Sequence, residues 1–291
     1  MRYTVANVPT IRVTDPDDPR IAVFRDVRER DLAGRLHGFI AEGEVVLRVL
    51  ARSRLHSARS LLIAAQRIER LRPLIDSFGP DVETYAAEQA VMDQIAGFPI
   101  HRGILAFGER APAVAAETLL ASLPADATVL ALFGIANHDN MGGLFRNAAA
   151  FGAAAVLLDP TCCDPLYRKA IRVSTGSALT LPFARFAGED DPVALLTAHG
   201  FETLALSPAG TTRLSELTPS TRTAILLGAE GPGLPKHILE RARTITIPMA
   251  PGVDSLNVAT TSGIVLHHLA AVHHRERRDV TRTRLCVTPA V

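Results

Sequence analysis

Three stretches rich in glycine and polar residues contain the side chains that could do chemistry. The first, residues 137–152, contains Asn140 and, just after Gly142-Gly143, Arg146. The pattern predicts that a strand ends, a polar loop turns through the glycines and a helix begins, with Arg146 within about its first turn. Open backbone N–H groups at a helix start favour an anion, as does a guanidinium. The stretch is therefore a candidate phosphate contact, although an arginine on a helix is often only a surface residue.

The second stretch, residues 226–235, has the sequence LLGAEGPGLP and follows an apolar run. It is only superficially similar to a nucleotide-binding loop, because the Walker lysine is absent and the glycine spacing is not that of the dinucleotide fingerprint. Glu230 would repel a phosphate held there, so a carboxylate at this place suits an amine, a hydroxyl or a cation. Taken alone, the stretch is better explained as a Gly/Pro turn with an exposed glutamate.

The third stretch, residues 247–264, starts where an apolar run typical of a strand meets Pro248. A loop follows, and then an apolar run that predicts a helix. Asp254 and Ser255 stand where an N-cap is expected, which places Ser255, Leu256 and Asn257 in the first turn. Backbone N–H groups point outward there, so the strand end, the loop and the helix start would form a pocket wall. Taken alone, Ser255 and Asn257 could be mere capping residues.

Alternating strands and helices around these stretches predict a second, layered α/β domain over residues 127–274. Apolar runs such as Ala224–Leu227 suit strands covered on both faces, as in a parallel sheet. Ligands bind outside the carboxyl ends of such strands, so the three stretches are expected to meet at one sheet edge. The expected strands are 128–133, 154–158, 201–206, 223–227 and 243–247, and the expected helices lie near 143–151, 165–173, 192–199, 235–241 and 257–273.

The rest of the chain divides into four further parts. A polar leader (1–18) precedes a small α/β domain (19–108), an Ala- and Pro-rich linker (109–126) is helical over 115–123, and a basic tail (275–291) is expected to be flexible. In the small domain we expect helices at 32–36, 44–50, 67–75 and 89–95, and strands at 39–40, 60–64, 82–86 and 103–107. The fold class is thus α/β with two domains.

The charge of the chain limits the class of protein that it can be. The net charge is only +1, which does not by itself indicate a polyanionic partner. Arginine supplies nearly all of the basic charge, which suits bidentate phosphate contacts but also follows from a GC-rich genome. Arginines gather at Arg48, Arg52, Arg54, Arg59, Arg67, Arg70, Arg72 and Arg102, where they form either a solvated face or a phosphate-tracking patch.

The cellular setting is inferred from what the sequence lacks. The three cysteines, Cys162, Cys163 and Cys286, do not make a disulfide framework. Residues 1–30 contain no apolar segment of a signal peptide, and no run of 18 apolar residues predicts a membrane span. These features predict a cytoplasmic protein with no membrane partner. We expect no metal, because the adjacent cysteines lack the spacing of zinc ligands.

The three stretches together resemble the motifs of SpoU/TrmH-type RNA ribose 2'-O-methyltransferases of the SPOUT class. The likeness rests on the order and spacing of Asn140-Met141-Gly142 with Arg146, Gly228–Gly233 and Ser255–Ala259, and covers about residues 128–273. Residues 162–174 are similar to a subgroup of this family, and residues 21–107 to its small substrate-binding domain. The resemblance implies a trefoil-knotted parallel-sheet methyltransferase domain behind a smaller RNA-binding domain. It also implies S-adenosylmethionine as cofactor, a homodimer, and tRNA or rRNA as structured RNA partner.

The same resemblance assigns roles to individual residues. Catalytic or substrate roles fall on Asn140, Arg146, Glu230, Ser255 and Asn257. Cofactor contacts fall on Leu206, Gly228, Ile247, Met249, Leu256 and Ala259. In this scheme Asn140 and Asn257 orient the ribose and the loops, and Glu230 holds Asn140 or Arg146. Arg146 is either the base proposed for the family or, since a guanidinium stays protonated, a phosphate clamp beside the reacting hydroxyl.

The histidines and the alternative functions complete the predictions. His267, His268, His273 and His274 are expected at the surface or in a dimer contact, and His138 is structural or contacts substrate. The alternatives to a ribose methyltransferase are a non-catalytic RNA-binding protein that retains the fold and a base methyltransferase of the same class. An unrelated nucleotide-binding α/β enzyme is disfavoured by the missing lysine and by Glu230.

Overall fold

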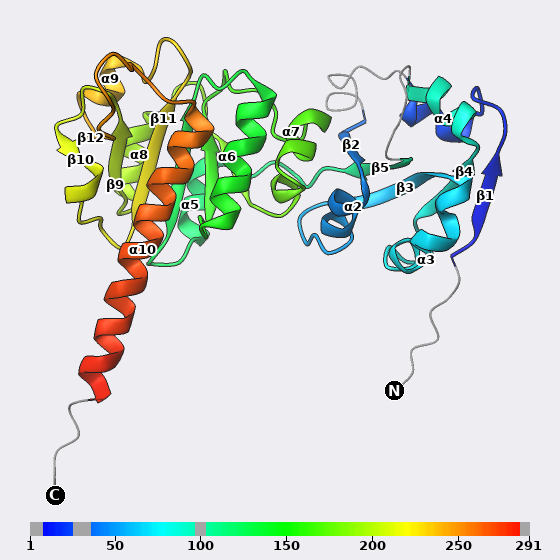
Figure 1. Cartoon of the computed structure of the whole chain (residues 1–291), viewed down its shortest axis with the longest axis horizontal. Coiled ribbons are helices and arrows are strands. Elements are labelled where there is room, and N and C mark those ends of the chain that lie inside the picture. The colour runs from blue at the N-terminus through cyan, green and yellow to red at the C-terminus, as the bar shows by residue number, and fades with distance from the viewer. Residues whose placement is uncertain (1–7, 26–35, 97–102, 286–291) are drawn as a thin grey trace, which may run out of the picture. The chain divides into compact units, whose positions relative to one another are not determined.

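The computed structural model describes residues 8–25, 36–96 and 103–285, and only the backbone course over 273–285 (Figure 1). These residues form two compact units. The first comprises the chain up to Pro112 together with Asp164–Thr180, and the second comprises Ala113–Cys163 and the chain from Leu181 onward. None of the described helices is both long and apolar enough to cross a membrane.

The first unit contains a mixed five-stranded sheet in the order β1-β4-β3-β5-β2. Strands β1, β4 and β3 are parallel, while β5 pairs antiparallel with β3 and β2. The strands are β1 (Thr10–Val13), β2 (Gly38–Glu42), β3 (Ser57–Ala64), β4 (Glu83–Ala87) and β5 (Ile104–Glu109), and the helices are α2 (Glu44–Leu50), α3 (Ile68–Asp76) and α4 (Gln89–Ala96), with a 3-10 turn η1 at Pro19–Phe24. The predicted elements of residues 39–107 are confirmed, while most of the helix predicted at 32–36 lies outside the described residues.

Two predictions at the boundaries of this unit are wrong. The leader is not loose throughout, because Thr10–Val13 pairs in register with β4 and Val13 is buried. Residues 164–180 fall within the predicted second domain (127–274), but their helix α7 (Arg168–Val173) packs on β2 within the first unit. Burial of Ala170 and Ile171 explains this placement. A helical pattern reveals that one face is apolar, but not which sheet covers that face.

The second unit contains a seven-stranded sheet, parallel at every pairing, in the order β10-β12-β9-β11-β6-β7-β8. Its strands are β6 (Thr128–Phe133), β7 (Ala155–Leu158), β8 (Phe183–Arg185), β9 (Glu202–Leu206), β10 (Thr212–Arg213), β11 (Thr223–Gly228) and β12 (Arg243–Thr246). Its helices are α5 (Ala116–Ser122), α6 (His138–Ala150), α8 (Pro192–Ala198), α9 (Lys236–Leu239) and α10 (Val258–Leu285). The predicted parallel α/β sheet is confirmed, and β8 and β10 are additional strands.

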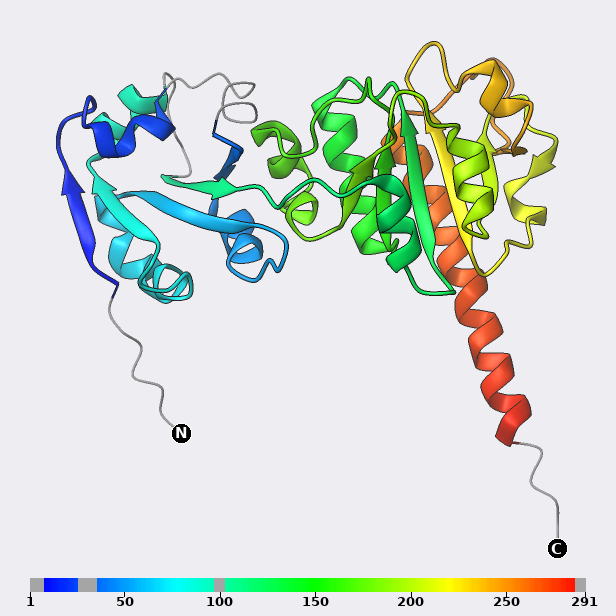
Figure 2. The same ribbon diagram turned by 180° about the vertical axis from the view of Figure 1, so that it is seen from behind.

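Helices cover both faces of this sheet, as the two opposite views show (Figures 1 and 2). Helices α5, α8 and α9 share one apolar core with every second residue of the central strands, such as Val129 and Ala131 in β6. The intervening residue Leu130 is also fully buried, and it faces the opposite layer, where α6 and α10 lie. Burial on both sides is why these strands are continuously apolar in sequence.

The ends of helices α6 and α10 differ from the prediction. Helix α6 begins at His138, five residues earlier than expected, because the Asn137 side chain accepts hydrogen bonds from the backbone N–H groups of Asp139 and Asn140. Arg146 therefore lies in the third turn rather than the first. Helix α5 confirms the helix predicted at 115–123, but this part of the predicted linker contributes buried residues to the second core. Helix α10 continues to Leu285, through the part of the tail expected to be flexible.

Candidate active site

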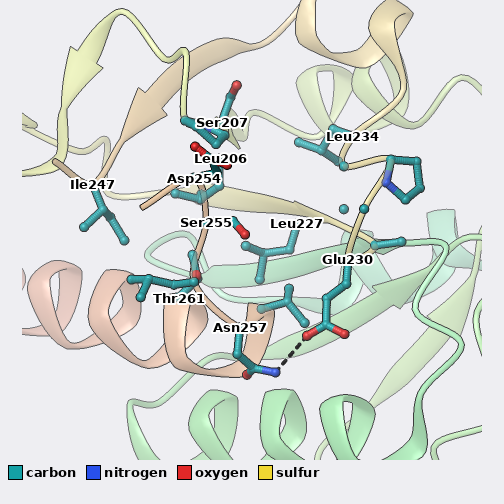
Figure 3. A pocket seen from close by; sticks show the side chains of 18 of the residues that line it. Leu206, Ser207, Leu227, Glu230, Leu234, Ile247, Asp254, Ser255, Asn257 and Thr261 are labelled. Carbon is teal, nitrogen blue, oxygen red and sulfur yellow. Dashed lines mark hydrogen bonds between the residues drawn. The ribbon is translucent and has the colours of Figure 1, made fainter. Parts of the chain in front are cut away.

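A pocket of about 640 Å³ lies at the carboxyl ends of strands β9, β11 and β12 (Figure 3). Its volume suits a small organic ligand. Apolar walls come from Leu206 at the end of β9, Leu227 in β11 and Ile247 just after β12. The remaining lining residues are Ser207, Pro208, Gly228, Ala229, Glu230, Gly231, Pro232, Gly233, Leu234, Leu239, Met249, Asp254, Ser255, Leu256, Asn257, Val258 and Thr261.

The loop after β11 forms one wall with its backbone. It folds back so that the Gly233 N–H donates to the Ala229 carbonyl at 3.0 Å. A Cβ on Gly228 would lie only 2.2 Å from the Gly233 carbonyl carbon, so a glycine is required for this close approach. Gly231 and Gly233 adopt φ values of +92° and +70°, which glycine accepts without strain. The pocket therefore presents bare peptide groups to a ligand along this wall.

Asn257 joins all three sequence stretches. Its Oδ1 accepts from the backbone N–H groups of Ala259 and Thr260 at 3.0 and 3.1 Å, which caps helix α10. Its Nδ2 donates to Asn140 Oδ1 and to Glu230 Oε1, each at 2.8 Å, and the bond to Glu230 is drawn in Figure 3. The capping bonds require the amide oxygen to face the helix, so the amide nitrogen must face the two partners.

This geometry corrects two expectations. The N-cap of α10 is Asn257, not Asp254 or Ser255, and both of those residues are exposed in the loop that lines the pocket. Glu230 binds Asn257, whereas we had expected it to hold Asn140 or Arg146. Asn140 lies at the opposite end of the same contact and is only 8% exposed. The three polar side chains thus form one connected group at the pocket rim.

The other predicted site residues divide between the pocket and its surroundings. Five of the six residues expected to contact a cofactor line the pocket, namely Leu206, Gly228, Ile247, Met249 and Leu256. The sixth, Ala259, faces helix α6, where a Cβ on Gly143 would lie 2.7 Å from the Ala259 Cβ. Ser255 lines the pocket. Arg146 is exposed, does not line the pocket, and forms no hydrogen bond or ion pair with the described residues.

Sequence reasoning missed several polar residues of the pocket. Ser207, Asp254 and Thr261 all line it, and Figure 3 places them around its rim with Ser255. Thr261 lies one turn after Asn257 on α10, a spacing that brings two side chains to the same face. That spacing was a usable signal. Ser207 follows β9 directly, so its position at the carboxyl edge of the sheet could also have been inferred.

Cys162 and His267 both lie outside the pocket. Burial raises the pKa of the Cys162 thiol to about 12, so the thiol stays protonated at neutral pH. Cys162 Sγ donates to the Leu132 carbonyl at 3.4 Å. His267 is exposed and makes an edge contact with the Phe151 ring. Within the described ranges, no three His, Cys, Asp or Glu side chains are grouped as a metal site.

A parallel α/β sheet with a glycine-walled pocket at its carboxyl edge defines a protein that holds a small ligand between its loops. The model of the SpoU rRNA Methylase family matches residues 127–267. A Mycobacterium bovis protein named as an uncharacterized tRNA/rRNA methyltransferase is 38% identical over 272 residues, which are 90% of this chain and 92% of the relative. The chain belongs to the SpoU methylase family.

Solved structures show the same architecture over both units. An RNA 2'-O ribose methyltransferase matches with a TM-score of 0.73 at 26% identity, covering 90% of this chain and 99% of the other. An AdoMet-bound rRNA methyltransferase from Sinorhizobium meliloti matches with a TM-score of 0.76 at 24% identity, covering 91% and 98%. The second likeness is one of fold. Together they show that other proteins share the fold of this chain.

Proposed function

We propose that this protein is an S-adenosylmethionine-dependent RNA methyltransferase that transfers a methyl group to a ribose 2'-hydroxyl of tRNA or rRNA. The observation that carries the proposal is the contact of Asn257 with Asn140 and Glu230 at the rim of a pocket of about 640 Å³. Membership of the SpoU family supports methyl transfer to RNA. The match to a structure titled as an RNA 2'-O ribose methyltransferase supports the ribose as acceptor.

S-adenosylmethionine is the ligand of the pocket in this proposal. The AdoMet-bound structure from Sinorhizobium meliloti supports this choice of donor. Leu206, Leu227 and Ile247 offer apolar contacts for an adenine ring, and the peptide groups of residues 228–233 offer hydrogen bonds. The Glu230 carboxylate suits the cationic end of the donor, since it is negative where a phosphate-binding loop would be positive.

The reaction itself is an in-line displacement. The ribose 2'-oxygen forms a bond to the methyl carbon, the carbon–sulfur bond breaks with its electron pair on sulfur, and the hydroxyl proton leaves. Because the donor is already activated by its positive charge, the protein mainly has to align the two reactants. Asn257 and Asn140 would hold the acceptor side of the pocket in register with the donor, because their contact joins α6 to the start of α10.

Arg146 fits a role in holding RNA better than a role as base. Its side chain is exposed and unpaired among the described residues, so it is available to a phosphate. A guanidinium stays protonated in proteins and binds phosphate in a bidentate way. In this proposal Arg146 clamps a phosphate next to the acceptor ribose and stabilises negative charge on the 2'-oxygen. The proton then leaves to that phosphate or to water.

The first unit is the proposed RNA-binding domain, and its arginines are not equivalent. Arg48 and Arg70 both pair with Glu44, and Arg59 pairs with Glu109. Arg52 and Arg54 are exposed and have no ion-pair partner within the described part of the chain. They flank Ser53, whose Oγ donates to the Leu179 carbonyl at 2.6 Å and accepts from the N–H groups of Leu55 and His56. This fixed turn makes Arg52 and Arg54 the preferred phosphate contacts.

Three further features belong to the same proposal. We propose that the loops around the pocket are threaded as a trefoil knot, that two copies pair as a homodimer, and that the enzyme works in the cytoplasm. The strand order supports the knot, because β12 pairs with β9 rather than with β11, the strand before it in sequence. Light scattering of the purified protein tests the dimer.

The decisive experiment is methyl transfer from labelled S-adenosylmethionine to purified tRNA and rRNA, followed by complete alkaline hydrolysis. A 2'-O-methyl group blocks cleavage at its own linkage, so the label should appear in alkali-resistant dinucleotides. Label in mononucleotides, on the base, would instead identify a base methyltransferase. RNA binding without any transfer would identify a non-catalytic RNA-binding protein. Either of these outcomes would refute the proposed reaction.

A further inference from the structure

Helices α6 and α10 approach each other along one stripe of α6. Asn140, Gly143 and Asn147 lie at positions i, i+3 and i+7 of that helix, a spacing that places them on the same face. Asn140 contacts Asn257 at the start of α10, and Gly143 faces Ala259 one step further along. The third residue of this face is Asn147.

Asn147 contacts α10 with its side-chain amide. Its Nδ2 donates to the Ala259 carbonyl at 2.6 Å and to Ser262 Oγ at 3.0 Å. Ser262 is fully buried, and its hydroxyl donates in turn to the Ala259 carbonyl at 2.7 Å. A Cβ on Gly263 would lie 3.2 Å from Asn147 Nδ2, so the amide fits tightly against the backbone of α10. The helices are therefore joined by a polar contact in a closely packed crossing.

The position of this contact relates it to the pocket. Ala259 and Ser262 lie in the first turns of α10, immediately after the capping residue Asn257. Asn147 is next to Arg146 and seven residues from Asn140, which is about 10 Å along a helix. Two contacts this far apart fix both the separation and the relative rotation of two helices.

We infer that Asn147 is a positioning residue for methyl transfer, an inference that rests on the function proposed above. Its amide holds α6 against α10, so that Arg146 and Asn140 on α6 keep their places relative to Asn257 and Glu230. Asn147 touches neither the pocket nor the RNA in this scheme. Its loss should therefore reduce turnover without a matching loss of donor affinity, because most of the pocket lining follows β9, β11 and β12 and only Val258 and Thr261 lie within α10.

The test variant is Asn147→Asp, which keeps the size of the side chain. It places an acceptor oxygen where an amide donor faced the Ala259 carbonyl, so the contact becomes repulsive. Misplacement of a catalytic group by about 1 Å can lower a rate about 100-fold. We expect kcat of Asn147→Asp to fall by about tenfold to 100-fold, with the S-adenosylmethionine Kd from calorimetry within about threefold of wild type.

A matched control separates positioning from simple loss of stability. Thr223 is fully buried, and its hydroxyl donates to the Ser220 carbonyl at 2.7 Å at the start of β11, the end opposite the pocket. Thr223→Val removes that hydrogen bond, and we expect it to lower Tm but to retain wild-type kcat well below Tm. Equal loss of kcat in Thr223→Val and Asn147→Asp at equal loss of Tm would overturn the inference. So would a Kd change large enough to explain the whole loss.

A second pair of variants covers the case in which Asn147→Asp does not fold. Gly143→Ala places a methyl group 2.7 Å from the Ala259 Cβ and should separate the same helices while leaving every hydrogen-bonding group in place. We expect it to reduce kcat more than donor affinity as well. Wild-type kcat in both Gly143→Ala and a folded Asn147→Ala would refute the inference alone. An inactive wild-type enzyme would instead refute the proposed function, and the inference with it.

Discussion

Replacement of Gly228 by alanine tests whether the donor pocket needs an unsubstituted backbone at the end of β11. Gly228 is not among the residues with positive φ, so alanine fits its backbone conformation without strain. The added Cβ would nevertheless lie 2.2 Å from the Gly233 carbonyl carbon and 2.3 Å from the Leu234 nitrogen. Both are backbone atoms, so no change of side-chain rotamer relieves the contact.

The magnitude follows from the distance by which the loop must move. Ordinary contact begins at 3.4 Å, so residues 233–234 must retreat by about 1 Å. Overpacking of this kind costs about 1–3 kcal/mol. If donor binding requires the original loop position, that energy is lost from binding, and Kd rises by about 5-fold to 150-fold because 1.4 kcal/mol is a factor of ten.

Calorimetric titration with S-adenosylmethionine measures this effect directly. The control is Gly188→Ala, because a Cβ at Gly188 meets no atom within 4 Å and its φ is not in the left-handed region. We expect Gly188→Ala to keep the wild-type Kd and Tm. An unchanged Kd in Gly228→Ala would show that the loop after β11 does not contact the donor, and would refute the assignment of this wall of the pocket.

Two further predictions concern the first unit. Arg52→Ala and Arg54→Ala should each reduce the slope of log K against log salt for RNA binding by about 0.7–0.9, as expected for the loss of one phosphate contact. Arg59→Ala should leave this slope unchanged, because the Arg59 guanidinium is already paired with Glu109. Filter binding across a salt series measures the slope for all three variants. Burial lowers the pKa of His56 to about 4. In the unfolded chain His56 therefore binds a proton near pH 6.5, whereas in the folded unit it stays neutral at that pH. The free energy of unfolding contributed by neutral His56 should therefore be fully present above about pH 6.5 and should fall steadily from there to about pH 4. The urea midpoint of His56→Gln should change less than that of the wild type over this range. An equal change in both proteins would contradict the linkage.

The arrangement of the site followed from the sequence because of one rule about parallel sheets. Strands of alternating β and α segments point the same way, so residues that follow them must gather at one edge. Gly228 at the end of β11, Glu230 just after it and Ile247 after β12 therefore line one pocket, as expected. The rule needs only the order of the elements, and that order is visible in the apolar runs.

The predictions that were wrong concern places where the local sequence allows several outcomes and contacts with distant residues decide between them. Asp254, Ser255 and Asn257 are all good N-caps within four residues, and local sequence cannot rank them. The outcome is decided by Asn140 and Glu230, which lie 117 and 27 residues from Asn257 in the chain. The start of α6 was predicted wrongly for a related reason. Glycines weaken a helix but do not prevent one when its face is packed against a neighbour.

Residues 164–180 belong to the first unit although they follow part of the second unit in sequence, and this affects how the chain folds during synthesis. Domains usually fold as units while the chain emerges from the ribosome, the amino-terminal one first. Here the amino-terminal sheet has helices α2, α3 and α4 but lacks α7 until Thr180 has been made, because α7 and the buried residues Ala178 and Leu179 belong to that unit. By then β6 and β7 have also emerged. The two units must therefore mature together, and a fragment that stops at Pro112 should expose the apolar surface that α7 covers.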